Sequence, residues 1–126
     1  MDEAPDTADS GNARFRAGVA LFNRGAFFDA HEVWEDLWRA CAAPDRRFYQ
    51  ALIQAAVALH HFQRHNLTGA ARLYASGRRY MEPYRPAHLG LAVDAFWDAV
   101  AAHLAAALGN AKTTPAPLPT IVLAEV

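Results

Sequence analysis

The stretch that decides the fold runs from Phe27 to Trp38 and reads FFDAHEVWEDLW. Its apolar residues recur every three or four positions, which is the spacing of one face of an α-helix. His31 and Glu35 are four residues apart, so they share a face of that helix. A face that carries an imidazole and a carboxylate beside tryptophans is either a buried hydrogen-bond network or a binding site. The stretch therefore predicts a helix and a candidate site together.

The length and composition of the chain are those of one globular domain. Of the 126 residues, 53% are hydrophobic and 20% are charged, a balance that excludes a disordered chain. Cys41 is the only cysteine, which excludes an intramolecular disulfide and a CxxC zinc motif. The longest apolar run, Ala55 to Leu59, is far shorter than the ~20 residues of a membrane span. We expect a cytoplasmic protein without membrane contact.

Helical spacing and turn residues predict an all-α fold, a compact bundle of about five helices with an extended Pro-rich C-terminal tail. No β-strand is expected. The helices are predicted over about residues 11–24, 27–41, 45–65, 69–81 and 91–108. At the level of the whole chain, we expect a flexible acidic N-terminal arm over residues 1–10, a single helical domain over 11–109 and the tail over 110–126.

The predicted 45–65 helix is apolar almost all round, which is typical of a central helix. Its polar residues fall on one stripe within about 60° of each other: Arg47, Gln50, Gln54, His61 and His65. Polar groups on such a helix need partners. A short loop makes this helix antiparallel to the 27–41 helix, so His31 should meet its later part. The sequence therefore predicts a cluster of His31, Glu35, Gln54 and His61.

Three interpretations of this cluster are open. The residues from His31 to Glu35 are similar to the zinc motif H-E-x-x-H with the second His replaced by Glu. That pattern predicts a divalent transition metal bound by His31, Glu35 and His61. The second interpretation is a small-ligand pocket with hydrolase-like chemistry. In the third, the cluster is a structural hydrogen-bond network in a non-catalytic interaction or oligomerisation module. Whether the protein is an enzyme stays open, as does a homo-oligomer.

Arginines outnumber lysines eleven to one, but they lack the interleaved aromatics of a nucleic-acid surface. Nucleic acid is therefore not an expected partner. Arg46 and Arg47 stand at the start of the 45–65 helix, where positive charge opposes the helix macrodipole. We expect them to pair with acids of the 27–41 helix. An anionic ligand is the alternative.

Two blocks of the sequence resemble the DUF309 family of small bacterial and archaeal helical proteins. The first runs from Asn23 to Trp38, and the second runs from Phe48 to His61 and continues at Asn66-Leu67-Thr68-Gly69-Ala70. The resemblance covers about residues 15–85 and implies an all-α fold without implying a function. Two positions where the family usually has Gly carry Ala51 and His65 here. By motif position, the resemblance implies a shared polar cluster: His31, Glu32, Glu35, Trp38, Gln50, Gln54 and His61.

Overall fold

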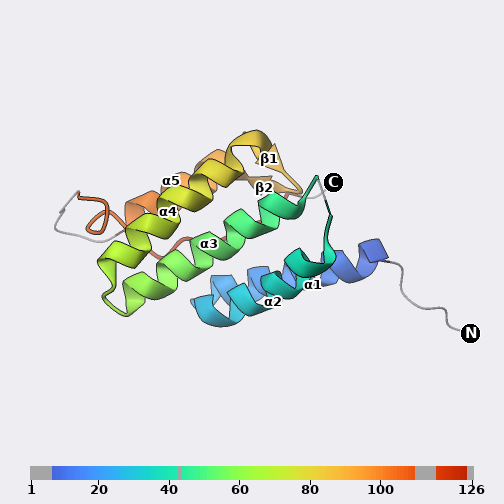
Figure 1. Ribbon diagram of the computed structural model, residues 1–126, viewed down its shortest axis with the longest axis horizontal. Helices are drawn as coiled ribbons and strands as arrows, with labels where there is room; N and C mark the ends of the chain where they lie inside the picture. The colour runs from blue at the N-terminus through green and yellow to red at the C-terminus, as the bar shows by residue number, and fades with distance from the viewer. Residues whose placement is uncertain (1–6, 43, 110–115, 125–126) are drawn as a thin grey trace, which may run out of the picture.

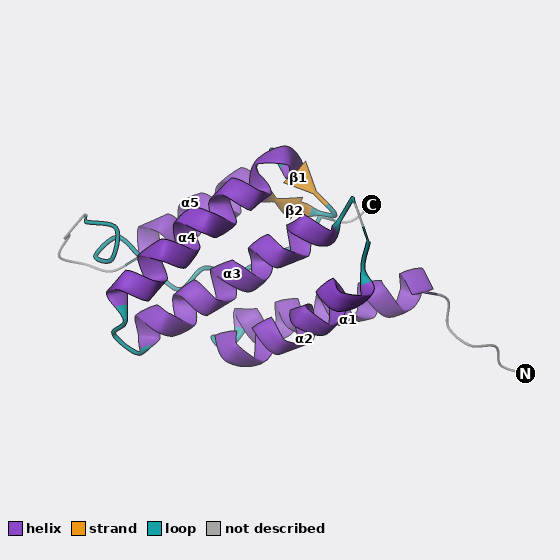
Figure 2. Cartoon of the chain, viewed as in Figure 1, coloured by secondary structure: helices purple, strands orange, loops and turns teal. Residues whose placement is uncertain are grey.

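A computed structural model describes residues 7–42, 44–109 and 116–124 of the chain (Figures 1 and 2). Within these residues the chain forms five α-helices, one 3-10 turn and one two-stranded antiparallel hairpin. The predicted all-α bundle is confirmed. In chain order the elements are α1 (Thr7–Asn23), α2 (Phe27–Ala40), α3 (Arg46–Gln63), α4 (Leu67–Met81), η1 (Glu82–Tyr84), β1 (Ala87–His88), β2 (Leu91–Ala92) and α5 (Val93–His103).

Local signals in the sequence place the helix ends. Gly25 has a φ of +79° and follows α1, as expected for a helix-ending glycine. Asn66 is the N-cap of α4, and its side-chain oxygen accepts a hydrogen bond from the Gly69 amide at 3.0 Å. His65 has a φ of +64° just after α3, at a position where the DUF309 family usually has glycine. A left-handed backbone explains why glycine suits that position.

The helices pack on their neighbours in chain order, and α3 lies between α2 and α4 (Figure 1). The central position predicted for this helix is confirmed. The fifth helix closes the bundle, because the Phe96 ring of α5 lies 5.7 Å from the Phe22 ring of α1. None of the described helices is both long and apolar enough to cross a membrane.

Trp34 of α2 is the centre of the contact between the first two helices. Its side chain is completely buried, and its indole Nε1 donates a hydrogen bond to the Phe15 carbonyl at 3.2 Å. Opposite it on α1 stands Gly18, where a Cβ atom would lie only 2.1 Å from Trp34 Nε1. The missing side chain at Gly18 thus makes the space that the indole fills.

The β-hairpin is the one element type that we did not expect. Leu89 and Gly90, with φ values of +50° and +83°, form the two-residue turn between β1 and β2. Two positive φ values match the twist of a tight hairpin. Because this hairpin uses Leu91 and Ala92, α5 begins at Val93, and it ends at His103 rather than near residue 108.

The described part of the tail, residues 116–124, has no regular secondary structure and packs against the bundle. The Asn23 side chain exchanges two hydrogen bonds with the backbone of Ile121, at 2.7 and 2.8 Å. Ile121 itself is buried, and Ala124 donates a backbone hydrogen bond to Gly90. At the other end of the chain α1 begins at Thr7, earlier than predicted. Residues 1–6 of the predicted arm and 110–115 and 125–126 of the predicted tail lie outside the described residues.

Candidate functional site

The structure places His31 beside His60, not beside His61. The exposed Phe28 ring contacts both imidazoles, with its centroid 4.7 Å from that of His31 and 5.2 Å from that of His60. The Nδ1 atom of His31 donates to the Phe28 carbonyl. Burial and the nearby Arg64, His61 and His31 lower the pKa of His60. This end of the molecule therefore carries a small aromatic and imidazole surface.

The predicted partners on α3 face the other way. A Cβ on Gly77 of α4 would lie 3.2 Å from the Cβ of Gln54, so Gln54 points toward α4. His61 accepts a hydrogen bond through Nδ1 from the Asn66 side-chain amide, at the start of α4. Gln50 is half-buried one turn before Gln54. Gln54 and His61 thus make these contacts with the α4 side, whereas His60, which points about 100° away from His61, contacts the Phe28 ring.

The acidic residues of α2 remain at its surface. Glu35 is half-exposed and forms an ion pair with Arg39 at 3.5 Å, while Glu32 is exposed. Within the described residues, no three His, Cys, Asp or Glu side chains gather closely enough to hold a metal ion. The structure therefore does not assemble the predicted metal ligands His31, Glu35 and His61.

The two arginines that begin α3 stack on aromatic rings. The Arg46 guanidinium lies 4.2 Å from the centre of the Trp38 ring, and that of Arg47 lies 5.0 Å from the Tyr80 ring. The predicted pairing with acids of α2 is wrong, since Glu35 and Asp36 pair with Arg39 instead. Cation–π contact holds the two guanidinium groups, and neither has a carboxylate partner among the described residues.

A large groove lies at the opposite end of α2 from His31. It is a groove of about 640 Å³ between the first half of α1, the end of α2, the start of α3 and the hairpin turn. Its lining combines apolar walls from Phe15, Leu37 and Leu89 with the polar groups of Cys41 and Tyr49. Clefts of about 300–1,000 Å³ with apolar walls and a few polar groups are typical of small-molecule sites.

Leu89 enters the groove from a strained backbone. A φ of +50° is unusual for a bulky residue, and left-handed backbone costs roughly 1–2 kcal/mol for residues other than glycine. Strain of this kind gathers at functional sites. The side chain is 44% exposed and lines the groove. The turn thus holds an exposed leucine at the mouth of the cavity rather than the asparagine or glycine that such turns favour.

The polar groups inside the groove keep their protons at neutral pH. Burial raises the pKa of Tyr49 to about 12, with smaller contributions from Asp45 and Cys41. Burial also raises the pKa of the Cys41 thiol, whose Sγ donates to the Ala42 carbonyl at 3.2 Å. The groove therefore offers a neutral hydroxyl and a neutral thiol beside apolar walls.

The Tyr49 hydroxyl gives the folded protein a distinctive response to alkaline pH. Its pKa of about 12 is above the ordinary tyrosine value of about 10, so the stabilisation is complete below pH 10 and is lost as the pH rises toward 12. We expect the free energy of unfolding to fall by up to about 2 kcal/mol in this window, and to fall less in Tyr49→Phe. Urea unfolding at several pH values measures both slopes. Equal slopes above pH 10 would contradict the assignment.

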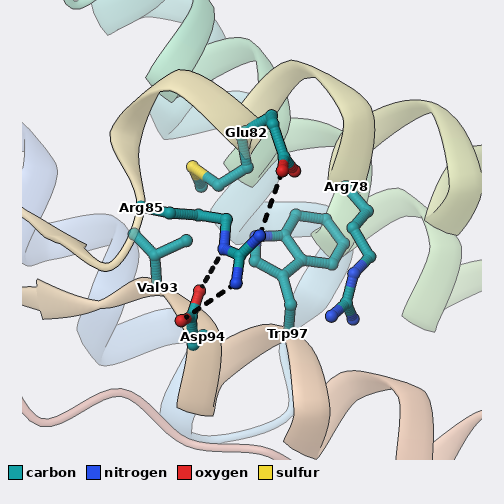
Figure 3. Close-up of a pocket in the computed structure, with 7 residues that line it drawn as sticks. Arg78, Glu82, Arg85, Val93, Asp94 and Trp97 are labelled. Carbon is teal, nitrogen blue, oxygen red and sulfur yellow. Dashed lines mark hydrogen bonds and ion pairs between the residues drawn. The ribbon is translucent and has the colours of Figure 1, made fainter.

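A second pocket lies between α4 and α5 (Figure 3). Arg85 crosses its mouth through ion pairs with Asp94 at 2.6 Å and Glu82 at 3.0 Å. Its hydrogen bond to Asp94 lowers the pKa of that carboxyl group. Trp97 lines the pocket, and its Nε1 is buried without a hydrogen-bond partner among the described residues. The volume of about 10 Å³ suits one water molecule and no organic ligand.

The fold and its cavities define a small helical protein built around the α2–α3 hairpin. Residues 15–73 match the model of the family described as "Domain of unknown function (DUF309)". This match confirms the resemblance to that family that the two sequence blocks predicted. The matched segment contains α2, α3 and the residues of α1 from Phe15 onward. The hairpin turn and the tail, which complete the groove, lie outside it.

One relative is similar to the chain over part of its length. The "Uncharacterized protein YpuF" of Bacillus subtilis (strain 168) is 36% identical over 69 residues. The match covers 54% of this chain and 40% of that protein. No solved structure matches the chain significantly. The comparisons therefore support the resemblance to the DUF309 family. They indicate no activity, so a function has to be inferred from the site.

Proposed function

We propose that this protein binds a small organic molecule in the groove between α1, α2, α3 and the hairpin turn. The observation that carries the proposal is a groove of about 640 Å³ whose lining combines apolar walls with the polar side chains of Cys41 and Tyr49. The strained Leu89 and the raised pKa of Tyr49 belong to the same place. Outlying backbone and shifted pKa values are both enriched at functional sites.

The α2 residues of the predicted polar cluster, His31 and Glu35, lie away from this groove and have a different role. His31 is tied to the Phe28 carbonyl and Glu35 is paired with Arg39, so both make local contacts within their own helix. We infer that this end of α2 supports the fold while the other end borders the ligand. The interaction or oligomerisation module and the cytoplasmic location stay predictions.

The single cysteine provides a direct test of the groove. We expect the fluorescent probe N-phenyl-1-naphthylamine to bind wild-type protein with a dissociation constant on the order of 10 μM, which is reasonable for an apolar ligand of this size. Bound probe should slow alkylation of Cys41, because that side chain lines the cavity. Alkylation with N-phenylmaleimide, followed by mass spectrometry, should in turn remove most of the probe binding.

A matched variant separates blocking of the groove from general damage. Cys41→Ser keeps the size of the side chain, and since it leaves no thiol, maleimide treatment should leave its probe binding unchanged. Leu89→Ala removes an exposed wall and should weaken the probe severalfold while the protein stays folded by circular dichroism. Probe binding that survives complete alkylation of Cys41 would overturn the proposed site.

A further inference from the structure

The charged residues at the rim of the groove are unevenly distributed. Arg14 and Arg16 both line it from α1, and Phe15 lies between them in sequence. Residues two apart on a helix point about 160° apart, so the two side chains leave α1 on either side of Phe15. Both of these long basic side chains line the groove.

Acidic residues contribute less than arginines to the rim of the groove. Among the described lining residues, Asp45 is the only acid. Its Oδ1 atom lies 2.8 Å from Nε2 of His88, and both side chains are about 30% exposed. Part of the carboxylate is thus engaged within the protein. The guanidinium groups of Arg14 and Arg16 are exposed, so an incoming ligand can reach them.

The interior of the groove carries no charge of its own. Leu37 and Phe15 are buried hydrocarbon, and Tyr49 and Cys41 are neutral groups able to donate hydrogen bonds. A ligand that uses both regions needs an apolar body for the interior and an acidic group for the rim. Arginine suits such a group because its planar fork binds a carboxylate, sulfonate or phosphate with two hydrogen bonds.

We propose that the groove selects small organic anions, in which an apolar ring or chain fills the cavity and one acidic group is attracted to the rim by Arg14 and Arg16. This inference rests on the proposed function of the groove and specifies the class of its ligand. Neutral apolar molecules enter the same space with lower affinity. Charge also makes the selection dependent on salt, because exposed ion pairs are screened.

Two probes that share an apolar body test this inference. N-phenyl-1-naphthylamine is neutral, and 8-anilino-1-naphthalenesulfonate is the same skeleton with a sulfonate. We expect the sulfonate to bind wild-type protein about tenfold more tightly than the neutral probe, a ratio within reach of two exposed charged contacts. In Arg14→Gln/Arg16→Gln this preference should fall to less than about twofold, and added sodium chloride should reduce it in wild-type protein.

A charge-matched control distinguishes a site from a general field. Arg24 and Arg72 are exposed and do not line the groove, so Arg24→Gln/Arg72→Gln removes the same charge elsewhere and should keep the tenfold preference. Equal binding of the two probes to wild-type protein, or an equal loss in both double variants, overturns the anion inference but leaves the groove proposal intact. Failure of the neutral probe to bind at all, or its binding outside the groove after Cys41 alkylation, overturns the proposed function itself.

Discussion

Trp34→Ala is expected to lower the free energy of unfolding by about 3–5 kcal/mol, the range for removing a fully buried tryptophan. The side chain has no exposed surface and lies between α1 and α2, in contact range of the Phe22 ring at 5.8 Å. Its loss leaves a cavity and removes the hydrogen bond from the indole to the Phe15 carbonyl. A domain is usually stable by only about 5–15 kcal/mol, so this one contact supplies a large share.

Trp34→Phe distinguishes the contribution of the aromatic ring to stability from that of the indole hydrogen bond. It keeps an aromatic side chain in the space and removes the Nε1 donor, so we expect a smaller loss than for alanine. Urea unfolding followed by far-ultraviolet circular dichroism measures both variants. A loss below about 1 kcal/mol for Trp34→Ala would contradict a central role for this contact, since core tryptophan truncations cost several times more.

Gly18→Ala is expected to destabilise the protein by about 1–3 kcal/mol, although alanine is the better helix former. The added Cβ would lie 2.1 Å from Trp34 Nε1 and 2.5 Å from Trp34 Cδ1. A real Cβ cannot approach so closely, so the indole or the two helices must move. The overpacking outweighs the propensity gain of about 1 kcal/mol.

Gly11→Ala is the control within the same helix. A Cβ on Gly11 would meet Leu37 Cδ1 at 3.7 Å, an ordinary van der Waals contact. We therefore expect Gly11→Ala to leave the protein as stable as wild type or up to about 1 kcal/mol more stable. Combining Gly18→Ala with Trp34→Phe should cost less than the sum of the two changes, because the smaller ring relieves the overlap. Additive losses would contradict the packing described above.

The helices could be predicted because their signals are local. The apolar spacing of Phe27 to Trp38, the left-handed Gly25 and the Asn66 cap each act within a few residues. Such signals do not depend on which other segment lies alongside. The β-hairpin was missed because its strands have two residues each, too few for an alternating pattern, and its turn uses Leu89 where asparagine is usual.

The polar cluster shows what the local signals in the sequence could not predict. The sequence indicated that His31 would meet the later part of α3, because a short loop makes the two helices antiparallel. It also predicted that the polar stripe with Gln54 and His61 would face α2, but apolar residues surround α3 almost completely, so the pattern does not determine which face turns toward α2. The structure turns His60 toward Phe28, beside His31, and leaves Gln54 against Gly77 of α4. The predicted and the observed arrangements differ by a rotation of α3 of about 100° about its axis, which is the angle between adjacent helical residues.

The sequence by itself determined a helical bundle, a central α3 and the resemblance of residues 15–73 to the DUF309 family. Helix formation depends on periodicity and capping, which are written within each segment. Only the tertiary structure decided the candidate site. Phe15, Cys41 and Leu89 share one groove although long stretches of chain separate them. Their proximity depends on how α1 packs on α2 and how the hairpin folds back, and no local pattern encodes that geometry.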